Sequence, residues 1–76
     1  QVLVNVRVAD KSRYAGNEAI AAAVTAAEEA LGDNGRVLVR PSGTEALIRV
    51  MAEGPDRAEI ERHVEAIADA IRQQLA

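Results

Sequence analysis

Valine occupies every second position at the start of the chain, at residues 2, 4, 6 and 8. Because the side chains of a strand alternate between its two faces, this period of two predicts a half-buried strand over residues 2–8. Residues 36–40 and 46–53 alternate in a similar way and are joined by a short loop. Strands that are joined so closely pair antiparallel. We therefore expect an antiparallel sheet.

Two further segments place apolar residues three or four positions apart, which is the period of a helix. The first follows Asn17, a residue type that caps helices, and ends before Gly32, where a left-handed C-cap is expected. The second follows Asp56, which resembles a capping box with Glu59 three residues later. The apolar stripes are Ile20, Val24, Ala27 and Leu31 in the first helix, and Ile60, Val64, Ile67, Ile71 and Leu75 in the second.

The expected order of elements is strand, helix, strand, strand, helix, with no internal repeat or linker. Since each helix has a single apolar stripe, both can pack on one face of the sheet, which predicts an α+β fold of two layers. A right-handed crossover through the first helix places the third strand in the centre, in the order 1-3-2. We expect residues 1–76 to form one domain. Its core is thin at this length, and without cysteine it has no disulfide or thiolate metal site.

Charge and composition exclude several classes of function. Nine basic residues against 12 acidic ones give a net charge of -3, which argues against nonspecific binding to nucleic acid or to an anionic membrane. One Tyr, with no Phe or Trp, provides almost no stacking platform for bases. No segment resembles a signal peptide or a membrane span, so we expect a cytoplasmic protein. Because a strand begins directly after Gln1, we expect the chain to be part of a longer protein.

Strand alternation also predicts the residues on the second face of the sheet. These are Leu3, Asn5, Arg7, Arg36, Leu38, Arg40, Leu47, Arg49 and Met51. The face is either an ordinary solvated surface with scattered apolar residues or a surface covered by another domain. The grouping of four large apolar side chains with four arginines favours a covered face.

The segment Arg40-Pro41-Ser42-Gly43-Thr44-Glu45, together with Arg49, is the strongest candidate for a binding site. Pro41 stiffens the entry to the loop, and Gly43 lets a ligand approach backbone N–H groups. Ser42 and Thr44 provide hydroxyl groups, and the guanidinium groups of Arg40 and Arg49 can each fork onto phosphate oxygens. These groups together predict a phosphate clamp. Ser and Gly are also common in plain hairpin turns, so a purely structural loop is the alternative.

The loop sequence, followed by Leu-Ile-Arg-Val-Met-Ala-Glu at residues 47–53, resembles the C-terminal domain of the bacterial phosphoglucosamine mutases, a family within the phosphohexomutase superfamily. Asn-Val-Arg-Val at residues 5–8 and Gly-Arg-Val-Leu-Val at residues 35–39 add to the resemblance, which covers essentially the whole chain. It implies a fold like that of the TATA-box-binding protein, without a nucleic-acid role. Its implied ligand contacts are Arg40, Pro41, Ser42, Gly43, Thr44 and Arg49. One departure is Ala46, where family members commonly have a proline that stiffens the loop exit.

The resemblance also implies a reaction, the interconversion of glucosamine 6-phosphate and glucosamine 1-phosphate through a bisphosphate intermediate. This domain would orient the phosphate that does not react, and it would be inactive alone. The phosphorylated serine and the Mg²⁺ loop of the family lie in other domains. No run of spaced aspartates is present here, so we expect no catalytic residue, cofactor or metal in this chain. The implied partners are the phosphosugar and the remaining domains.

Two alternative functions remain open at this point. One is the same domain of a phosphomannomutase or phosphoglucomutase, and the other is a free-standing ferredoxin-like regulatory module. His63 has no partner that the sequence identifies, so we expect a helix-surface histidine and not a catalytic base. Tyr14 either packs on a neighbouring domain or covers the edge of the sheet.

Overall fold

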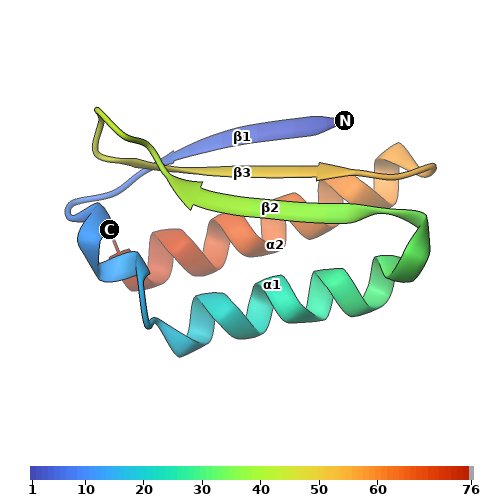
Figure 1. The fold of residues 1–76 in the computed structure, drawn as a ribbon, viewed down its shortest axis with the longest axis horizontal. Coiled ribbons are helices and arrows are strands. Elements are labelled where there is room, and N and C mark those ends of the chain that lie inside the picture. The colour runs from blue at the N-terminus through green and yellow to red at the C-terminus, as the bar shows by residue number, and fades with distance from the viewer. Residues whose placement is uncertain (76) are drawn as a thin grey trace.

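The computed structural model of the chain describes residues 1–75 as a sheet with two helices packed on one of its faces (Figure 1). The elements are, in chain order, β1 (Val2–Arg7), the 3-10 helix η1 (Lys11–Tyr14), α1 (Glu18–Leu31), the 3-10 helix η2 (Gly32–Asn34), β2 (Arg36–Pro41), β3 (Leu47–Glu53) and α2 (Arg57–Leu75). The predicted α+β fold of two layers is confirmed.

The strands pair in the order β1-β3-β2, and both pairs are antiparallel. The predicted central position of β3 is therefore confirmed. Val50 of β3 lies opposite Val4 on one side and opposite Val39 on the other, so the valines of the three strands share one face. This face lies against the helices. Val8, expected at the end of the first strand, follows β1 instead and donates its N–H to the Ala46 carbonyl at 3.0 Å.

Both helices begin and end at the residues that the sequence indicates. The Asn17 side chain accepts a hydrogen bond from the Ile20 N–H at 3.1 Å, and the Asp56 carboxylate accepts one from the Glu59 N–H at 3.2 Å. Gly32 has a φ of 56°, a backbone conformation that favours glycine at a helix C-terminus. No helix within residues 1–75 is long and apolar enough to cross a membrane.

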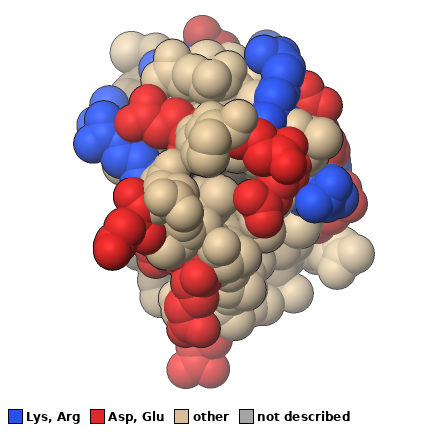
Figure 2. Space-filling model, turned by 90° about the vertical axis from the view of Figure 1, so that its right-hand side faces the viewer, with Lys and Arg blue, Asp and Glu red and all other residues tan. Residues whose placement is uncertain are grey.

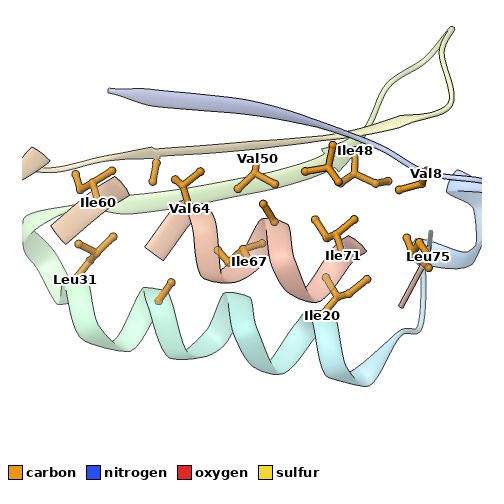
Figure 3. Close-up of a cluster of buried hydrophobic side chains, with 14 residues drawn as sticks. Val8, Ile20, Leu31, Ile48, Val50, Ile60, Val64, Ile67, Ile71 and Leu75 are labelled. Carbon is orange, nitrogen blue, oxygen red and sulfur yellow. The ribbon is translucent and has the colours of Figure 1, made fainter. Parts of the chain in front are cut away.

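The core between the two layers is entirely aliphatic (Figure 3). Its buried members come from β1, β3 and the two helices, together with Val8, and the β2 residues Val37 and Val39 are partly buried against them. Val50, Val64, Ile67 and Ile71 have no exposed surface, whereas Val24 is only partly buried. A small domain that buries so few large side chains depends strongly on each of them.

The opposite face of the sheet has no helix over it. Leu3 is 52% exposed and Leu38 is 44% exposed, as the alternation predicts. The prediction is wrong for Leu47, which is only 7% exposed. Leu47 is the first residue of β3, and its backbone N–H and carbonyl bond to Glu45 and Ser42 of the loop. These bonds bring the loop backbone against Leu47. The alternation of side chains along a strand does not predict this contact.

The segment between β1 and α1 contains the 3-10 helix η1. Tyr14, at the end of η1, is half-buried against the core, and its hydroxyl donates to the Val39 carbonyl at 3.2 Å. Since β2 is an edge strand, this contact decides between the two alternatives for Tyr14: the ring covers the sheet edge.

We predict that Ile67→Ala lowers the free energy of unfolding by about 2–5 kcal/mol, because it leaves a cavity in the thin core of a small domain. Val50→Ala, on the facing strand, should also be costly. Leu3→Ala is the matched control, since Leu3 is 52% exposed on the other face. Urea unfolding measures all three variants. If Ile67→Ala unfolded at the same urea concentration as Leu3→Ala, the assignment of the buried face would be wrong.

Burial raises the pKa of the Tyr14 phenol above its usual value, because the ionised form loses solvation. A raised pKa in the folded state means that this contribution to stability is present below pH 10 and is lost as the pH rises further. Tyr14 is the only tyrosine, so ultraviolet absorbance reports its ionisation directly. We expect a midpoint above that of the urea-unfolded chain. Identical midpoints would contradict the burial of the ring against β2.

Candidate functional site

Residues 42–46 connect β2 to β3 and project from one end of the sheet (Figure 1). Pro41 is the last residue of β2, and Ser42 then donates its N–H to the Leu47 carbonyl at 2.9 Å. The Leu47 N–H donates in turn to the Glu45 carbonyl, also at 2.9 Å. These two bonds close the loop on itself, so its backbone has a defined shape next to the strand ends.

Beside this loop lies an open hollow of about 290 Å³. It is lined by Arg40, Pro41, Ser42, Gly43 and Arg49. The fold therefore brings together five of the six residues that the sequence suggested for a phosphate clamp. The sixth, Thr44, is exposed on the loop but does not line the hollow.

The two arginines lie directly opposite each other on neighbouring strands, Arg40 on β2 and Arg49 on β3. Both are exposed on the face without helices. Arg49 donates from Nε to the Asn5 side-chain oxygen at 3.3 Å. Within residues 1–75, neither arginine forms an ion pair with a carboxylate. Like charges that face each other across a sheet repel, and an anion between them would remove that cost.

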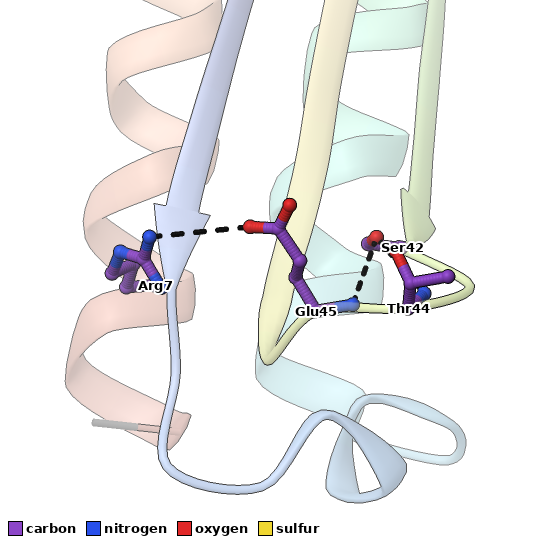
Figure 4. Close-up of polar contacts among 4 residues, drawn as sticks. All are labelled: Arg7, Ser42, Thr44 and Glu45. Atoms are coloured by element: carbon purple, nitrogen blue, oxygen red, sulfur yellow. Dashed lines mark hydrogen bonds and ion pairs between the residues drawn. The ribbon is translucent and has the colours of Figure 1, made fainter.

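The Ser42 hydroxyl has a role within the loop itself. Its oxygen accepts hydrogen bonds from the N–H groups of Thr44 and Glu45, each at 3.3 Å (the Glu45 bond is drawn in Figure 4). The expected cluster of several free N–H groups is thus smaller than predicted, because Ser42 occupies two of them. The hydroxyl proton of Ser42 can still be donated to a ligand.

Gly43 is the residue of the loop whose backbone is accessible to a ligand. Its N–H has no acceptor within the described part of the chain. A Cβ built on Gly43 would meet no atom within 4 Å, and its φ is not positive. The backbone conformation therefore does not require glycine. What glycine provides is access, since any side chain there would project beside the hollow.

Glu45 is the acidic residue of the loop, and its position matters for anion binding. Its carboxylate points toward β1, where it lies 3.9 Å from the Arg7 guanidinium (Figure 4). An exposed pair of this kind contributes little to stability. It nevertheless keeps the carboxylate on the β1 side of the loop, away from Arg40 on β2.

A larger hollow of about 530 Å³ lies at the opposite end of the sheet. Its lining includes Asp33 and Glu53, and its one cationic side chain, Arg36, pairs with Glu53 at 2.5 Å. Figure 2 views this end of the molecule and shows acidic side chains spread among the basic ones. The one cationic side chain of the larger hollow is therefore already paired with a carboxylate.

No group of three or more His, Asp and Glu side chains gathers within residues 1–75. The described residues therefore do not fit a Mg²⁺ site, which needs several oxygen ligands close together. His63 is half-buried on α2, with Nε2 3.9 Å from the Glu59 carboxylate. It lies on the helical layer, and the arginines lie on the other face of the sheet, so His63 is not part of this site.

Sequence reasoning missed Lys11. Its ammonium group donates to the Ser42 carbonyl at 2.5 Å, across 31 residues of sequence separation. Nothing in the local pattern of residues 10–16 indicates this contact, because it depends on the position of η1 beside the end of β2.

Comparison with known proteins agrees with the fold. Residues 3–70 match the family model described as phosphoglucomutase/phosphomannomutase, C-terminal domain. The phosphoglucosamine mutase of Brevibacillus brevis is 63% identical over 99% of this chain, and that of Thermobifida fusca is 51% identical over the full chain. The chain spans 17% of the length of each of these relatives.

Two solved structures of Aspergillus fumigatus N-acetylphosphoglucosamine mutase are also similar. One, with GlcNAc-6P and magnesium, has a TM-score of 0.80 and 28% identity over 99% of this chain and 16% of that one. The other, a variant with glucose 1,6-bisphosphate, has a TM-score of 0.79 and 29% identity over 93% of this chain and 15% of that one. The chain thus belongs to the phosphoglucomutase/phosphomannomutase family and corresponds to its C-terminal domain.

Proposed function

We propose that this chain is the phosphate-binding domain of a phosphoglucosamine mutase, and that the hollow beside residues 42–46 holds a phosphate of the sugar substrate. The observation that carries the proposal is the pair of arginines, Arg40 and Arg49, which face each other and line that hollow, and which have no carboxylate partner among residues 1–75. Each guanidinium can donate two parallel hydrogen bonds to phosphate oxygens.

The loop complements the two cations. Gly43 offers a free N–H and Ser42 a hydroxyl proton, both on the lining of the same hollow. Two guanidinium groups attract an anion by their charge, and their hydrogen bonds together with that of a backbone N–H set its orientation. Thr44, whose side chain does not line the hollow, would join the contact only if the loop shifts on binding. Pro41 contributes rigidity at the end of β2.

The parent reaction that we propose is the interconversion of glucosamine 6-phosphate and glucosamine 1-phosphate through a bisphosphate. The names of the relatives support this reaction, as does the bisphosphate bound to one solved relative. In it, this domain would hold the phosphate that does not react, which positions the sugar and contributes no covalent step. The Mg²⁺ of the full enzyme would be held by residues outside this chain, since one solved relative contains magnesium and the described residues here do not fit it.

The sugar itself remains the open part of the proposal. The matched family model is named for phosphoglucomutases and phosphomannomutases, whose substrates carry the same phosphate on other sugars. Nothing in the hollow distinguishes these sugars, because its groups suit phosphate. We propose glucosamine because the two bacterial relatives are phosphoglucosamine mutases. A cytoplasmic location is part of the same proposal.

The exposed face of the sheet fits a contact with the rest of such an enzyme. A second hollow of about 200 Å³ joins Leu3, Leu38 and Met51 to the two arginines. The relatives are about six times longer than this chain, so most of each mutase lies outside it. We propose that this face packs against another domain of the parent enzyme, which would also close the phosphate hollow from one side.

We predict that the chain binds inorganic phosphate or glucosamine 6-phosphate weakly, since it provides contacts to the phosphate but not to the sugar. Chemical-shift titration should move the amides of Ser42, Gly43 and Thr44 and the side-chain signals of Arg40 and Arg49. Arg49→Met should abolish these shifts. Arg36→Met is the control, because Arg36 is a paired arginine at the opposite end of the sheet. Shifts centred on α2 would contradict the site.

In a phosphoglucosamine mutase that carries this domain, Arg49→Ala should lower kcat/KM while leaving the melting temperature unchanged. A charge-assisted contact is worth about 1.5–3 kcal/mol, which corresponds to roughly a ten- to hundredfold loss. Arg49→Lys should recover part of it, because an ammonium keeps the charge but loses the fork. Lost stability with normal kinetics would instead show that Arg49 is structural.

A further inference from the structure

We propose that Lys11 is a positioning residue for the phosphate-binding loop, and that the segment from Val8 to Tyr14 holds this loop in its binding shape. This inference rests on the proposed function for the loop. It concerns a part of the chain that lies far from the loop in sequence and does not line the phosphate hollow.

Three contacts from this segment meet the backbone on both sides of the loop. On the entry side, Tyr14 donates from its hydroxyl to the Val39 carbonyl at 3.2 Å, and Lys11 donates from Nζ to the Ser42 carbonyl at 2.5 Å. On the exit side, the Val8 N–H donates to the Ala46 carbonyl at 3.0 Å. Because all three acceptors are backbone carbonyls, these contacts fix the path of the loop whatever its side chains bind.

The segment is itself held in place, which lets it act as a support. The Asp10 carboxylate accepts bonds from the N–H and hydroxyl of Ser12, at 3.0 and 2.6 Å, and so fixes the start of η1. The Ala9 N–H donates to the Leu75 carbonyl at 3.1 Å, which ties the segment to the end of α2. The half-buried Tyr14 ring packs against the core. Lys11 therefore projects from an anchored turn.

Lys11 is the residue of this segment whose charged side chain bonds directly to the loop. It is half-buried, and within residues 1–75 it forms no ion pair with a carboxylate. A short bond from an ammonium to a carbonyl is stronger than a neutral one, because the donor is charged. It fixes Ser42, whose N–H bonds to Leu47 and whose hydroxyl oxygen organises Thr44 and Glu45. One contact from Lys11 thereby steadies the residue on which the shape of the loop depends.

The test compares three variants of the chain: Lys11→Met, Lys11→Arg and Arg13→Met. Arg13 is the matched control, because it lies on the same turn, is exposed, and its loss changes the net charge equally without touching the loop. Two quantities are measured by NMR. The first is the solvent-exchange rate of the Ser42, Thr44 and Glu45 amides without phosphate, with the Ile48 and Val50 amides as the internal reference. The second is the affinity for inorganic phosphate.

We expect Lys11→Met to raise the exchange of the three loop amides by roughly three- to tenfold, and to weaken phosphate binding by a similar factor. Arg13→Met should leave loop exchange unchanged and weaken binding less, through charge alone. Lys11→Arg, which keeps a charged donor, should restore most of the loop protection.

Equal effects of Lys11→Met and Arg13→Met on both quantities would overturn the proposal, because Lys11 would then act only through net charge. If the parent chain bound no phosphate, the proposed function of the loop would fail, but the exchange rates would still decide the role of Lys11. Should Lys11→Met unfold, as its Ile48 and Val50 amides would show, Lys11→Gln, which loses the charge but keeps a polar side chain, replaces it. Loop exchange raised above that of Arg13→Met would then support the proposal, and loop exchange equal to that of Arg13→Met would contradict it.

Discussion

Arg40 and Arg49 lie opposite each other across the β2–β3 pair, and this juxtaposition of two positive charges is the constraint on which the candidate site depends. Antiparallel pairing through a loop of only a few residues leaves little freedom in register, so the two arginines meet on one face by geometry. The alternating valines on the other face are buried or partly buried against the helices, which fixes the arginines toward the open side. The fold thus holds two guanidinium groups close enough to repel each other, and a bound anion would reduce this repulsion.

The elements that hold these two arginines and the adjoining loop in place come from distant parts of the chain. Arg49 belongs to β3, the central strand, where Val50 and Ile48 have no exposed surface. The loop beside it is bonded by residues that precede α1, and that segment is tied to the end of α2. A thin aliphatic core therefore keeps the site rigid by holding its elements in place, while the site residues themselves stay exposed.

Much of this architecture could be predicted from residue patterns. The alternating valines, the caps at Asn17 and Asp56 and the helical stripes identify the elements, because each depends on local geometry. The types and spacing of Arg40, Ser42, Gly43 and Arg49 led to the candidate site, and these four residues line one hollow in the structure. Three features could not be predicted. The burial of Leu47, the capture of two loop N–H groups by Ser42 and the contact of Lys11 with the loop all depend on how the loop folds back in three dimensions.

The central claim is that Arg40 and Arg49 form one anion site. A double-mutant cycle of Arg40→Met and Arg49→Met, with the free energy of unfolding measured in chloride and in phosphate, tests it most directly. In chloride we expect a repulsive coupling between the two arginines of about 0.2–1 kcal/mol. In phosphate the coupling should become favourable, because the stabilisation by the anion needs both guanidinium groups. A coupling that is the same in both salts would show that phosphate does not bind between them, and would contradict the account.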